Sequence, residues 1–504
     1  MRNPWKVSRT SGTVLSVFAF GACAQIAAAS TPPTVMVLGP SDVNALYAGS
    51  ADGERTPGIY LAKQNANRVA WGHQGASPND DLSIRVWTRS NQTIETVAMD
   101  LSLNAGYKLQ LAGMSGDGEV IVGTSWSPDP PYNDTVKPFT WQFGNDGDDL
   151  NTDFDANMTF VPVRGGGANA DGSIIGIQAS TSVFPLASPT AHLYEVGSSI
   201  ASLTDSFTAF SGPYALNADN SIVVGFRQCS NELRPGFARN ECRTCQGGGG
   251  APFIWDEANG AGYVSDSGTV PEGVATGVSW VTGRAVGRID HLFGISDALV
   301  WSRGFRTTGE RNACNDFECE PLWPLYLDIT DGAVWSEAND IGTHFAVGST
   351  SNGFFPDAPA ISGGNQHAVW WDENAVGYDL NEVFNCFMPN TSNYELRLVS
   401  ATSITNDDRA IAGKAVERSR EDEFHSWSSW KPVAWLAQLE SCPGDLDYDG
   451  DVDGDDFEIF ADSYNNVVCG LAGCCLPGDL DWNRQVDTAD FALFVSAYND
   501  VLCP

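Results

Sequence analysis

The sequence predicts a mainly β protein, a β-propeller of about seven blades, followed by a small all-α C-terminal domain. A unit made of a polar turn and a strand, clearest at residues 215–225, recurs along most of the chain. Each copy is followed by a short apolar strand that ends in an aromatic residue. The last 64 residues carry a different repeat, whose two copies are 34 residues apart.

The recurring unit joins turn-forming residues to a β-branched strand. In residues 215–225, the Asn and Asp residues at positions 217–220 form turns readily and tolerate left-handed dihedral angles. Residues 222–224 are Ile-Val-Val, which favours a strand, and Gly225 is expected to end that strand. Related turns occur at residues 116–123, 169–176, 281–287, 339–348 and 406–413.

The apolar strands set the repeat number. Their final residues are Trp87, Trp141, Tyr194, Trp255, Trp301, Trp370 and Trp435. The shortest step, from Trp255 to Trp301, is 46 residues, and the longest, from Trp301 to Trp370, is 69. Such a period is typical of propellers, because one small sheet cannot bury both of its faces. We expect the aromatic residues in the blade cores rather than as sugar platforms.

Ring closure would protect the strand edges, and the strand predicted at residues 34–38 would then complete the last blade. An array of β-sandwiches is the alternative. With their final A-x-x-W strand, residues 35–436 resemble extracellular propeller repeats of the kelch and HAF types. The predicted propeller domain covers residues 30–440, and its long inter-strand insertions are expected to form loops on one face, where binding usually occurs.

Residues 1–29 read as a secretory signal peptide. Arg2, Lys6 and Arg9 precede an apolar run, which ends in small residues at positions 27–29. The predicted location is therefore extracellular or at the cell surface, with lipid attachment at Cys23 as a minor alternative. No other stretch is long and apolar enough to predict a membrane span.

The composition of the chain argues against several classes of function. The chain has 27 basic and 63 acidic residues, a formal charge of −36, which repels nucleic acid and anionic membranes. No basic patch is interleaved with aromatic residues, so nucleic-acid binding is not expected. The six His residues are scattered, and no nucleophile elbow or His-Glu-x-x-His motif occurs. The many carboxylates leave a glycosidase-like pair open without locating one.

Two loops near the C-terminus have the oxygen ligands that calcium prefers, at calcium-loop spacing. In the first loop, positions 1, 3, 5, 9 and 12 are Asp445, Asp447, Asp449, Asp453 and Asp456, and Asp451 offers its backbone carbonyl at position 7. In the second, the same positions hold Asp479, Asp481, Asn483, Asp487 and Asp490, and Gln485 offers the carbonyl. Arg484 replaces Gly450 at position 6, so the second site is expected to be weaker.

An amphipathic helix is predicted after each loop. Phe457, Phe460, Ala461 and Tyr464 lie on one helical face, and the same pattern returns 34 residues later at positions 491, 494, 495 and 498. Together, the loops and helices of residues 442–504 resemble a type I dockerin. That resemblance implies two calcium ions and docking onto a cohesin-like partner, often in complexes for polysaccharide breakdown.

The resemblance has two departures. The family reads its partner through positions 10 and 11 of each loop, commonly Ser-Thr, whereas this chain has Gly454-Asp455 and Thr488-Ala489. The domain also has extra cysteines. A calcium-stabilised cap, or an anchor to another cell-surface protein, is the alternative to cohesin docking.

Secretion makes disulfides the default for the 12 cysteines. We expect Cys442 to pair with Cys469 and Cys475 with Cys503, which leaves Cys474 free or paired elsewhere.

The sequence thus predicts a secreted, non-enzymatic propeller that binds a protein or a glycan through its loops and docks through its tail. The alternative is a carbohydrate-active enzyme that the tail brings to a polysaccharide. Two carboxylates converging in the central channel would favour the enzyme, and a channel lined by apolar or small residues would favour binding.

Overall fold

The computed structural model describes the sheets, many of their turns and the C-terminal helices. The described residues are 34–40, 58–74, 82–96, 108–126, 137–143, 161–180, 190–195, 200–203, 210–228, 250–257, 260–263, 272–290, 296–301, 335–351, 366–372, 376–385, 387–422, 424–439, 444, 446, 452–465, 478–480 and 486–500. The predicted signal peptide and all twelve cysteines, including Cys23 and the predicted disulfide partners, lie outside them.

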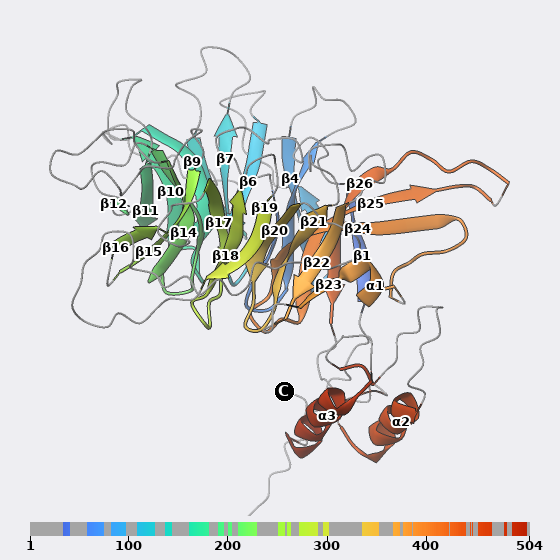
Figure 1. Ribbon diagram of the computed structural model, residues 1–504. Coiled ribbons are helices and arrows are strands. Elements are labelled where there is room, and N and C mark those ends of the chain that lie inside the picture. The colour runs from blue at the N-terminus through green and yellow to red at the C-terminus, as the bar shows by residue number, and fades with distance from the viewer. Residues whose placement is uncertain are drawn as a thin grey trace, which may run out of the picture.

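The described strands form seven antiparallel blades of three or four strands, with neighbouring strands in chain order in all but the last blade (Figure 1). Blade 1 contains β2 (Ile59–Leu61), β3 (Arg68–Gln74), β4 (Leu82–Thr88) and β5 (Thr93–Thr96). Blade 2 contains β6 (Lys108–Met114), β7 (Val120–Trp126) and β8 (Lys137–Gln142). Blade 3 contains β9 (Val161–Ala168), β10 (Ile174–Ser180), β11 (Thr190–Glu195) and β12 (Ile200–Ser202). Blade 4 contains β13 (Phe210–Leu216), β14 (Ile222–Gln228), β15 (Gly250–Asp256) and β16 (Gly260–Tyr263).

Blades 5 and 6 are joined by one parallel bridge, between Ser296 and Trp335, and otherwise form separate antiparallel sheets. Blade 5 contains β17 (Glu272–Val278), β18 (Ala285–Asp290) and β19 (Ser296–Trp301); blade 6 contains β20 (Trp335–Ile341), β21 (Ala346–Ser351), β22 (Gln366–Trp371) and β23 (Gly377–Asp379). The short helix α1 (Leu380–Val383) follows blade 6. The sequence did not predict it.

The N-terminal strand completes the last blade, as predicted. Blade 7 has the strand order β1 (Thr34–Pro40), β26 (Lys431–Gln438), β25 (Ala410–Ser419) and β24 (Tyr394–Ile404). β1 pairs antiparallel with β26. Strands from the two ends of the repeat region therefore share one sheet, and the prediction of a ring of seven blades is confirmed.

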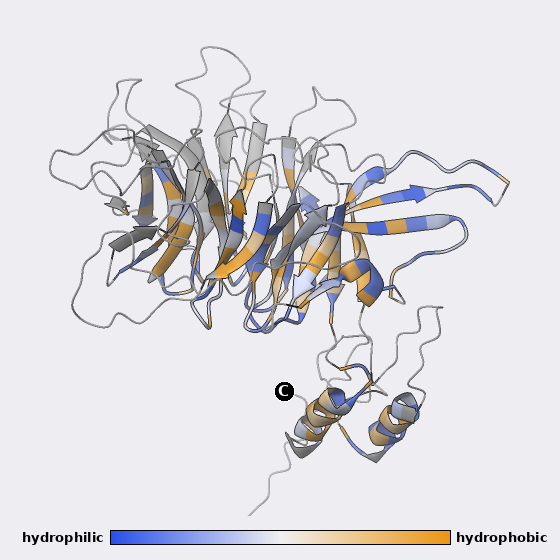
Figure 2. Cartoon of the chain, in the orientation of Figure 1, coloured by the Kyte–Doolittle hydropathy of each residue, from blue (hydrophilic) through white to orange (hydrophobic). Residues whose placement is uncertain are grey.

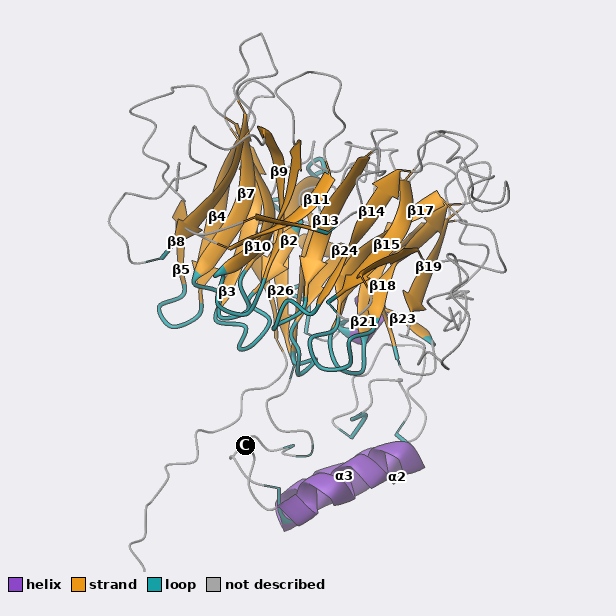
Figure 3. Cartoon of the chain, turned by 90° about the vertical axis from the view of Figure 1, so that its left-hand side faces the viewer, coloured by secondary structure: helices purple, strands orange, loops and turns teal. Residues whose placement is uncertain are grey.

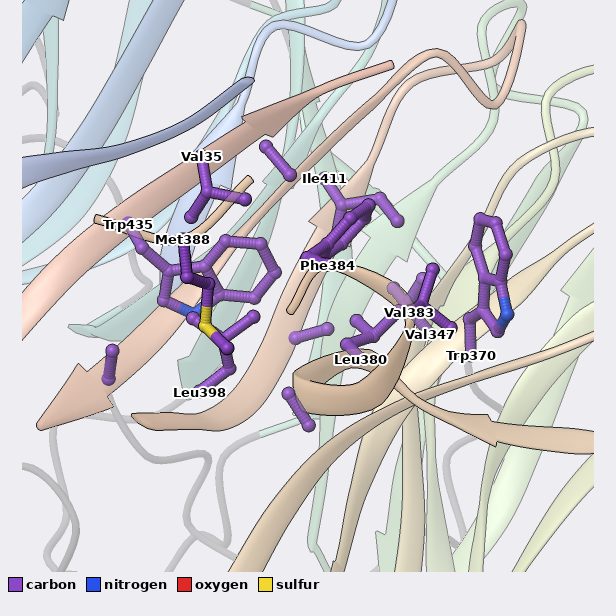
Figure 4. Close-up of a cluster of buried hydrophobic side chains, with 14 of the residues drawn as sticks. Val35, Val347, Trp370, Leu380, Val383, Phe384, Met388, Leu398, Ile411 and Trp435 are labelled. Atoms are coloured by element: carbon purple, nitrogen blue, oxygen red, sulfur yellow. The ribbon is translucent and has the colours of Figure 1, made fainter. Parts of the chain in front are cut away.

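The aromatic residues that end the third strands lie mainly in the core, also as predicted. Trp87, Tyr194, Trp370 and Trp435 are buried. Figure 4 shows Phe384, just after α1, with Trp370 and Trp435 on either side, and its ring centroid is 6.4 and 6.5 Å from theirs. Figure 2 shows hydrophobic residues in the strands and along α2 and α3. Every residue of β21 is buried, and so are five consecutive residues of β26, which is typical of a sheet covered on both faces.

The prediction that Gly225 ends its strand is wrong, because Gly225 lies in the middle of β14 and pairs with Pro213 and Phe253. Blades 6 and 7 show the reason for a glycine here. A Cβ on Gly348 would lie 1.9 Å from the Glu337 carbonyl oxygen, and one on Gly413 would lie 2.0 Å from the Ser400 carbonyl oxygen. A β-bulge brings the first strand of the blade against the second at this point.

The two predicted C-terminal helices are present as α2 (Gly454–Asn465) and α3 (Thr488–Asp500). They share a core with the loop residues that precede them. Its buried members are Leu446, Val452, Phe460, Leu480, Val486 and Phe494, three pairs at the 34-residue offset. Within the described part of the chain, no helix is both long and apolar enough to span a membrane.

Candidate functional sites in the channel and the C-terminal loops

The polar turns of the repeat unit gather at one end of the sheets, shown in teal in Figure 3. The turn between β13 and β14 is held by side chains. Asn217 Oδ1 accepts a hydrogen bond from the Ile222 amide at 2.9 Å, and Asp219 Oδ1 accepts from the Ser221 hydroxyl at 2.7 Å. Hydrogen bonds from Ser221 hold the pKa of Asp219 below its usual range. Blade 3 repeats this turn, with Asp171 in the place of Asp219.

Hydrogen bonds from these turns join the blades in a closed circle. In order around the ring, the donors and acceptors are Gln64 to Gly116, Gly116 to Asn169, Ala170 to Ala218, Trp280 to Leu216, Arg284 to Thr343, Thr343 to Asn406, and Asn406 to Lys63. Every blade takes part, and the last bond returns to blade 1. The turns therefore fasten neighbouring blades to one another in addition to linking strands.

Two side chains reach across the ring at this end. The Lys63 ammonium, from blade 1, lies 2.7 Å from the Asp340 carboxylate of blade 6 and donates to the carbonyls of Val278 and Ile341 at 3.2 Å. The Trp280 ring, from blade 5, packs so closely on blade 2 that a Cβ on Gly116 would lie 2.0 Å from it. The Lys63 Nζ is 5.9 Å from the centroid of that ring. These side chains cross the channel.

A cavity lies at the centre of the ring, and all seven blades line it. The volume that a water-sized molecule can occupy in it is about 50 Å³. Its lining is Tyr60, Leu61, Lys63, Gly113, Met114, Gly167, Ala168, Tyr214, Ala215, Leu216, Thr276, Trp280, Asp340, Thr402 and Ser403. Apolar and small residues predominate, and Asp340 is the one carboxylate in this lining.

The polar groups of the lining already bind other blades. Thr276 Oγ1 donates to the Ala338 carbonyl at 2.6 Å, and Thr402 Oγ1 donates to the Ile59 carbonyl at 2.7 Å. Besides the ion pair with Lys63, the Asp340 carboxylate accepts from the Ile341 and Ile404 amides. These groups hold the ring together, and the lining presents no pair of carboxylates for acid–base chemistry.

Sequence reasoning missed this channel cluster. Asp340 was interpreted as part of a turn at residues 339–348, but it lies in β20 beside the bulge that follows Ala338. Lys63 is not part of any recognisable sequence motif. The one available signal was a lysine in an acidic chain close to a predicted inner strand, which is too common to single out.

An arm of blade 7 carries a second cluster that the sequence analysis missed. β24 and β25 reach beyond the other blades (Figure 1). On this arm, guanidinium groups and indole rings alternate in the order Arg420, Trp427, Arg418, Trp430 and Arg397, at 4.3 to 5.6 Å. Arg418 also pairs with Glu395. Both indoles are thus covered by arginines, which stiffens an arm that has little core of its own.

Of the predicted calcium ligands, the described residues include Asp453, Asp456, Asp479, Asp487 and Asp490. The other predicted ligands, Asp445, Asp447, Asp449, Asp451, Asp481, Asn483 and Gln485, lie outside the described residues. Among the described residues, no group of three or more metal-binding side chains is assembled.

The described ligand residues have the same surroundings in both repeats. Asp456 Oδ1 accepts from the Leu446 amide at 2.5 Å, and its Oδ2 accepts from the Asp453 amide at 2.7 Å. Asp490 accepts from Leu480 and Asp487 at 2.6 and 2.8 Å. Both carboxylates are 0 % exposed. Each repeat therefore places a buried carboxylate against its loop backbone. Carboxylate oxygens are ligands that calcium prefers, so these residue types fit calcium.

No protein-family model and no curated protein matches this chain. Solved structures similar to it include TolB from Acinetobacter baumannii, with 15% identity, TM-score 0.29, and coverage of 48% of this chain and 51% of that one. The acylaminoacyl peptidase of Pyrococcus horikoshii has 11% identity and TM-score 0.38, with 77% and 57% covered. AofleA from Arthrobotrys oligospora has 11% identity and TM-score 0.32, with 80% and 93% covered.

The alignments span only about half the length of the TolB and peptidase chains. At these TM-scores, the likenesses carry no argument about function. The propeller assignment stands on the order and pairing of the strands.

Proposed function

We propose that this chain is a secreted binding protein without catalytic activity, whose propeller holds a protein or glycan ligand and whose C-terminal domain docks in the presence of calcium. The composition of the channel lining carries the first part of this proposal. Its single carboxylate, Asp340, is neutralised by Lys63 and accepts hydrogen bonds from two backbone amides. A glycosidase of the usual kind uses two carboxylates that flank the scissile bond, and this lining contains one.

The channel cluster of Lys63, Trp280 and Asp340 also indicates which end of the ring binds the ligand. Lys63 and Trp280 cross the channel at the end where the turns gather, so that end is closed to a ligand. Among the described residues, the arm of blade 7 lies at the opposite end of its sheet from the 405–409 turn. Binding residues are concentrated on loops that a rigid scaffold positions, so we propose that the ligand binds at the arm's end of the ring.

For the tail, the proposal rests on the repeated ligand sequence and on the matched surroundings of Asp456 and Asp490. Calcium supplies positive charge that offsets the crowded carboxylates of each loop. Asp456 and Asp490 hold the loop backbones through hydrogen bonds, and a cohesin-like or cell-surface protein is the proposed docking partner. Six of the exposed large apolar side chains among the described residues, Phe457, Tyr464, Phe491, Leu493, Val495 and Tyr498, are on α2 and α3. We propose that these side chains contact the docking partner.

Binding without turnover is the test of the propeller's role. The purified full chain is incubated with a panel of soluble and insoluble polysaccharides and glycan-bearing proteins, and both depletion from solution and release of reducing sugar ends are measured. Retention on one of these without new reducing ends supports the proposal. Release of new reducing ends would instead show an enzyme. Loss of that release in an Asp340→Asn chain that still unfolds at the wild-type urea midpoint would place the site in the channel.

Docking is tested separately, on a resin that carries a cohesin domain. Retention of the full chain with calcium and elution by a chelator support the docking function. Calcium binding without retention would leave a calcium-stabilised cap.

A further inference from the structure

The alternating arginines and tryptophans on the arm of blade 7, called here the Arg–Trp stack, form one row. Two guanidiniums lie on each indole, those of Arg418 and Arg420 on Trp427 and those of Arg397 and Arg418 on Trp430. The distances from guanidinium carbon to ring centroid are similar, at 4.3 to 5.6 Å. All five residues are partly exposed. The arm therefore presents three guanidiniums to solvent at similar intervals.

Strand alternation sorts the charges of the arm between its two faces. Glu417 directly precedes Arg418 in β25, so the two side chains point to opposite faces. On its face, the Glu417 carboxylate accepts a hydrogen bond from the Tyr394 hydroxyl at 2.7 Å. Glu395 contacts the Arg–Trp stack, where it pairs with Arg418. With three arginines against this one partner, the stack keeps a positive charge in a chain whose formal charge is −36.

Hydrogen bonds fix the orientation of two of the guanidiniums. Arg418 Nε donates to Glu395 Oε2 at 2.7 Å, and its Nη2 donates to the same oxygen. Arg420 donates to the Ser392 carbonyl through Nε at 2.9 Å and through Nη2 at 2.6 Å. A guanidinium has five N–H donors in a rigid fork, so two bonds do not exhaust it. Groups that are already held in place cost less entropy to order when a ligand binds.

The chemistry of this surface suits an anion better than a neutral sugar. A neutral sugar packs on an open aromatic face, whereas the faces of Trp427 and Trp430 carry guanidiniums. The guanidinium fork instead matches a carboxylate or sulfate group through paired hydrogen bonds. At physiological salt, charges further away than about 8 Å are largely screened, so the acidic remainder of the chain does not prevent this contact.

We propose that the Arg–Trp stack binds an acidic polysaccharide, one that repeats a carboxylate or sulfate group along its chain. This rests on the binding function proposed above and names its class of ligand. Arg397 and Arg420 at the two ends and Arg418 in the middle contact successive anionic groups of the polymer. The regular row favours a polymer with a repeated charge over a folded protein. The two indoles keep the guanidiniums in line against their mutual repulsion.

Binding of the full chain to immobilised polymers tests the class of ligand. Polygalacturonate and its methyl ester share a backbone, as do dextran sulfate and dextran, so the members of each pair differ chiefly in charge. A chelator in the buffer prevents calcium from bridging the acidic chain and the acidic polymer. The chain should bind the charged member of at least one pair at least about 10-fold more tightly than the uncharged one. Added salt should weaken this binding.

Substitutions that each remove one charge test the surface. Arg397→Gln should weaken binding at least about 5-fold, because it removes a guanidinium that contacts the polymer. Arg409→Gln is the matched control: it removes the same charge from the partly exposed turn at the other end of blade 7 and should leave the affinity unchanged. Glu395→Gln should tighten binding, since it removes the carboxylate that competes for Arg418.

A conservative variant covers the case in which Arg397→Gln disturbs the arm. Arg397→Lys keeps the charge but lacks the fork, so a chain with the wild-type urea midpoint should bind with an intermediate loss.

The outcomes separate the inference from the function on which it rests. Failure to bind either acidic polymer, equal binding within both pairs, or equal effects of Arg397→Gln and Arg409→Gln would overturn the inference. Retention on polyglutamate but on neither acidic polysaccharide would also overturn it and would assign the stack to an acidic protein. In each of these cases, retention on a neutral glycan without new reducing ends would leave the proposed binding function in place. Release of reducing ends would overturn that function even where the stack binds.

Discussion

The Lys63 ammonium lies 2.7 Å from the Asp340 carboxylate, so blade 1 and blade 6 are joined across the central channel by an ion pair. The two side chains are 14% and 8% exposed. The pair is therefore largely shielded from water, and it is surrounded by backbone partners from blades 5, 6 and 7.

Lys63→Met is expected to destabilise the propeller strongly, because it leaves the Asp340 carboxylate buried without its cation. Breaking such a pair from one side costs about 3–5 kcal/mol. Urea unfolding followed by Trp fluorescence measures the loss. The double variant Lys63→Met/Asp340→Asn removes both charges and should regain part of that stability. If both proteins unfold at the wild-type midpoint, the ion pair does not hold the ring.

Gly348→Ala is expected to destabilise blade 6, because the new Cβ would lie 1.9 Å from the Glu337 carbonyl oxygen. Forcing the strands apart should cost about 1–3 kcal/mol or more. Gly72→Ala is the matched control: Gly72 lies in the second strand of blade 1, and its Cβ would meet nothing within 4 Å. That change should be neutral or stabilise by about 0.5 kcal/mol. Equal losses in chemical denaturation would contradict the close-approach explanation.

Acid should weaken the turns of blades 3 and 4. The hydroxyl and amide of Ser221 lower the pKa of Asp219, and those of Ser173 lower the pKa of Asp171. A folded-state pKa below the unfolded value gives stability that is present above about pH 4 and is lost as the pH falls through the folded pKa. Because both carboxylates are largely exposed, the contribution of each is at most about 0.5 kcal/mol.

Asp219→Asn tests this assignment, since the amide oxygen still accepts at the turn but no longer titrates. The variant should have a slightly lower urea midpoint at pH 6, because its amide lacks the charge that strengthens these hydrogen bonds. Its midpoint should fall less steeply toward pH 2.5, where the two chains should become similar. An identical slope would show that Asp219 does not contribute to the acid loss.

Chelation of calcium should lower the unfolding temperature of the C-terminal domain. A site filled at a hundredfold excess over its dissociation constant stabilises by about 2.7 kcal/mol, and a core of this size supplies only about 3–5 kcal/mol. Scanning calorimetry of the full chain, with calcium and then with a chelator, should show one transition shift while the propeller transition stays in place.

The two loops should differ in this experiment. Asp445→Ala should lower the domain's transition more than Asp479→Ala, because the first loop has Gly450 where the second has Arg484. Thermograms that are unaffected by the chelator would end the calcium proposal.

The sequence by itself determined the features that depend on neighbouring residues. Asn217 and Asp219 form the turn before Ile222 through hydrogen bonds that span at most five residues. The residue types alone therefore predict this turn. The seven aromatic residues that end the apolar strands, of which Trp435 is the last, predicted the number of blades, because each blade is formed by one continuous stretch of the chain. The face containing Phe457, Phe460 and Tyr464 predicted α2 for the same reason.

Only the tertiary structure decided what the distant contacts do. Lys63 and Asp340 meet because the ring closes, and no pattern in the chain links them. Gly225 looked like the end of a strand, yet it lies in the middle of β14 and pairs with Pro213 beside a bulge of β13, a position that depends on pairing rather than on local propensity. Gly444 and Gly478 likewise lie close to helices of the opposite repeats, where a Cβ would be 3.1 and 3.0 Å from Ala497 and Ser463, a crossing that arises only when the two repeats share one core.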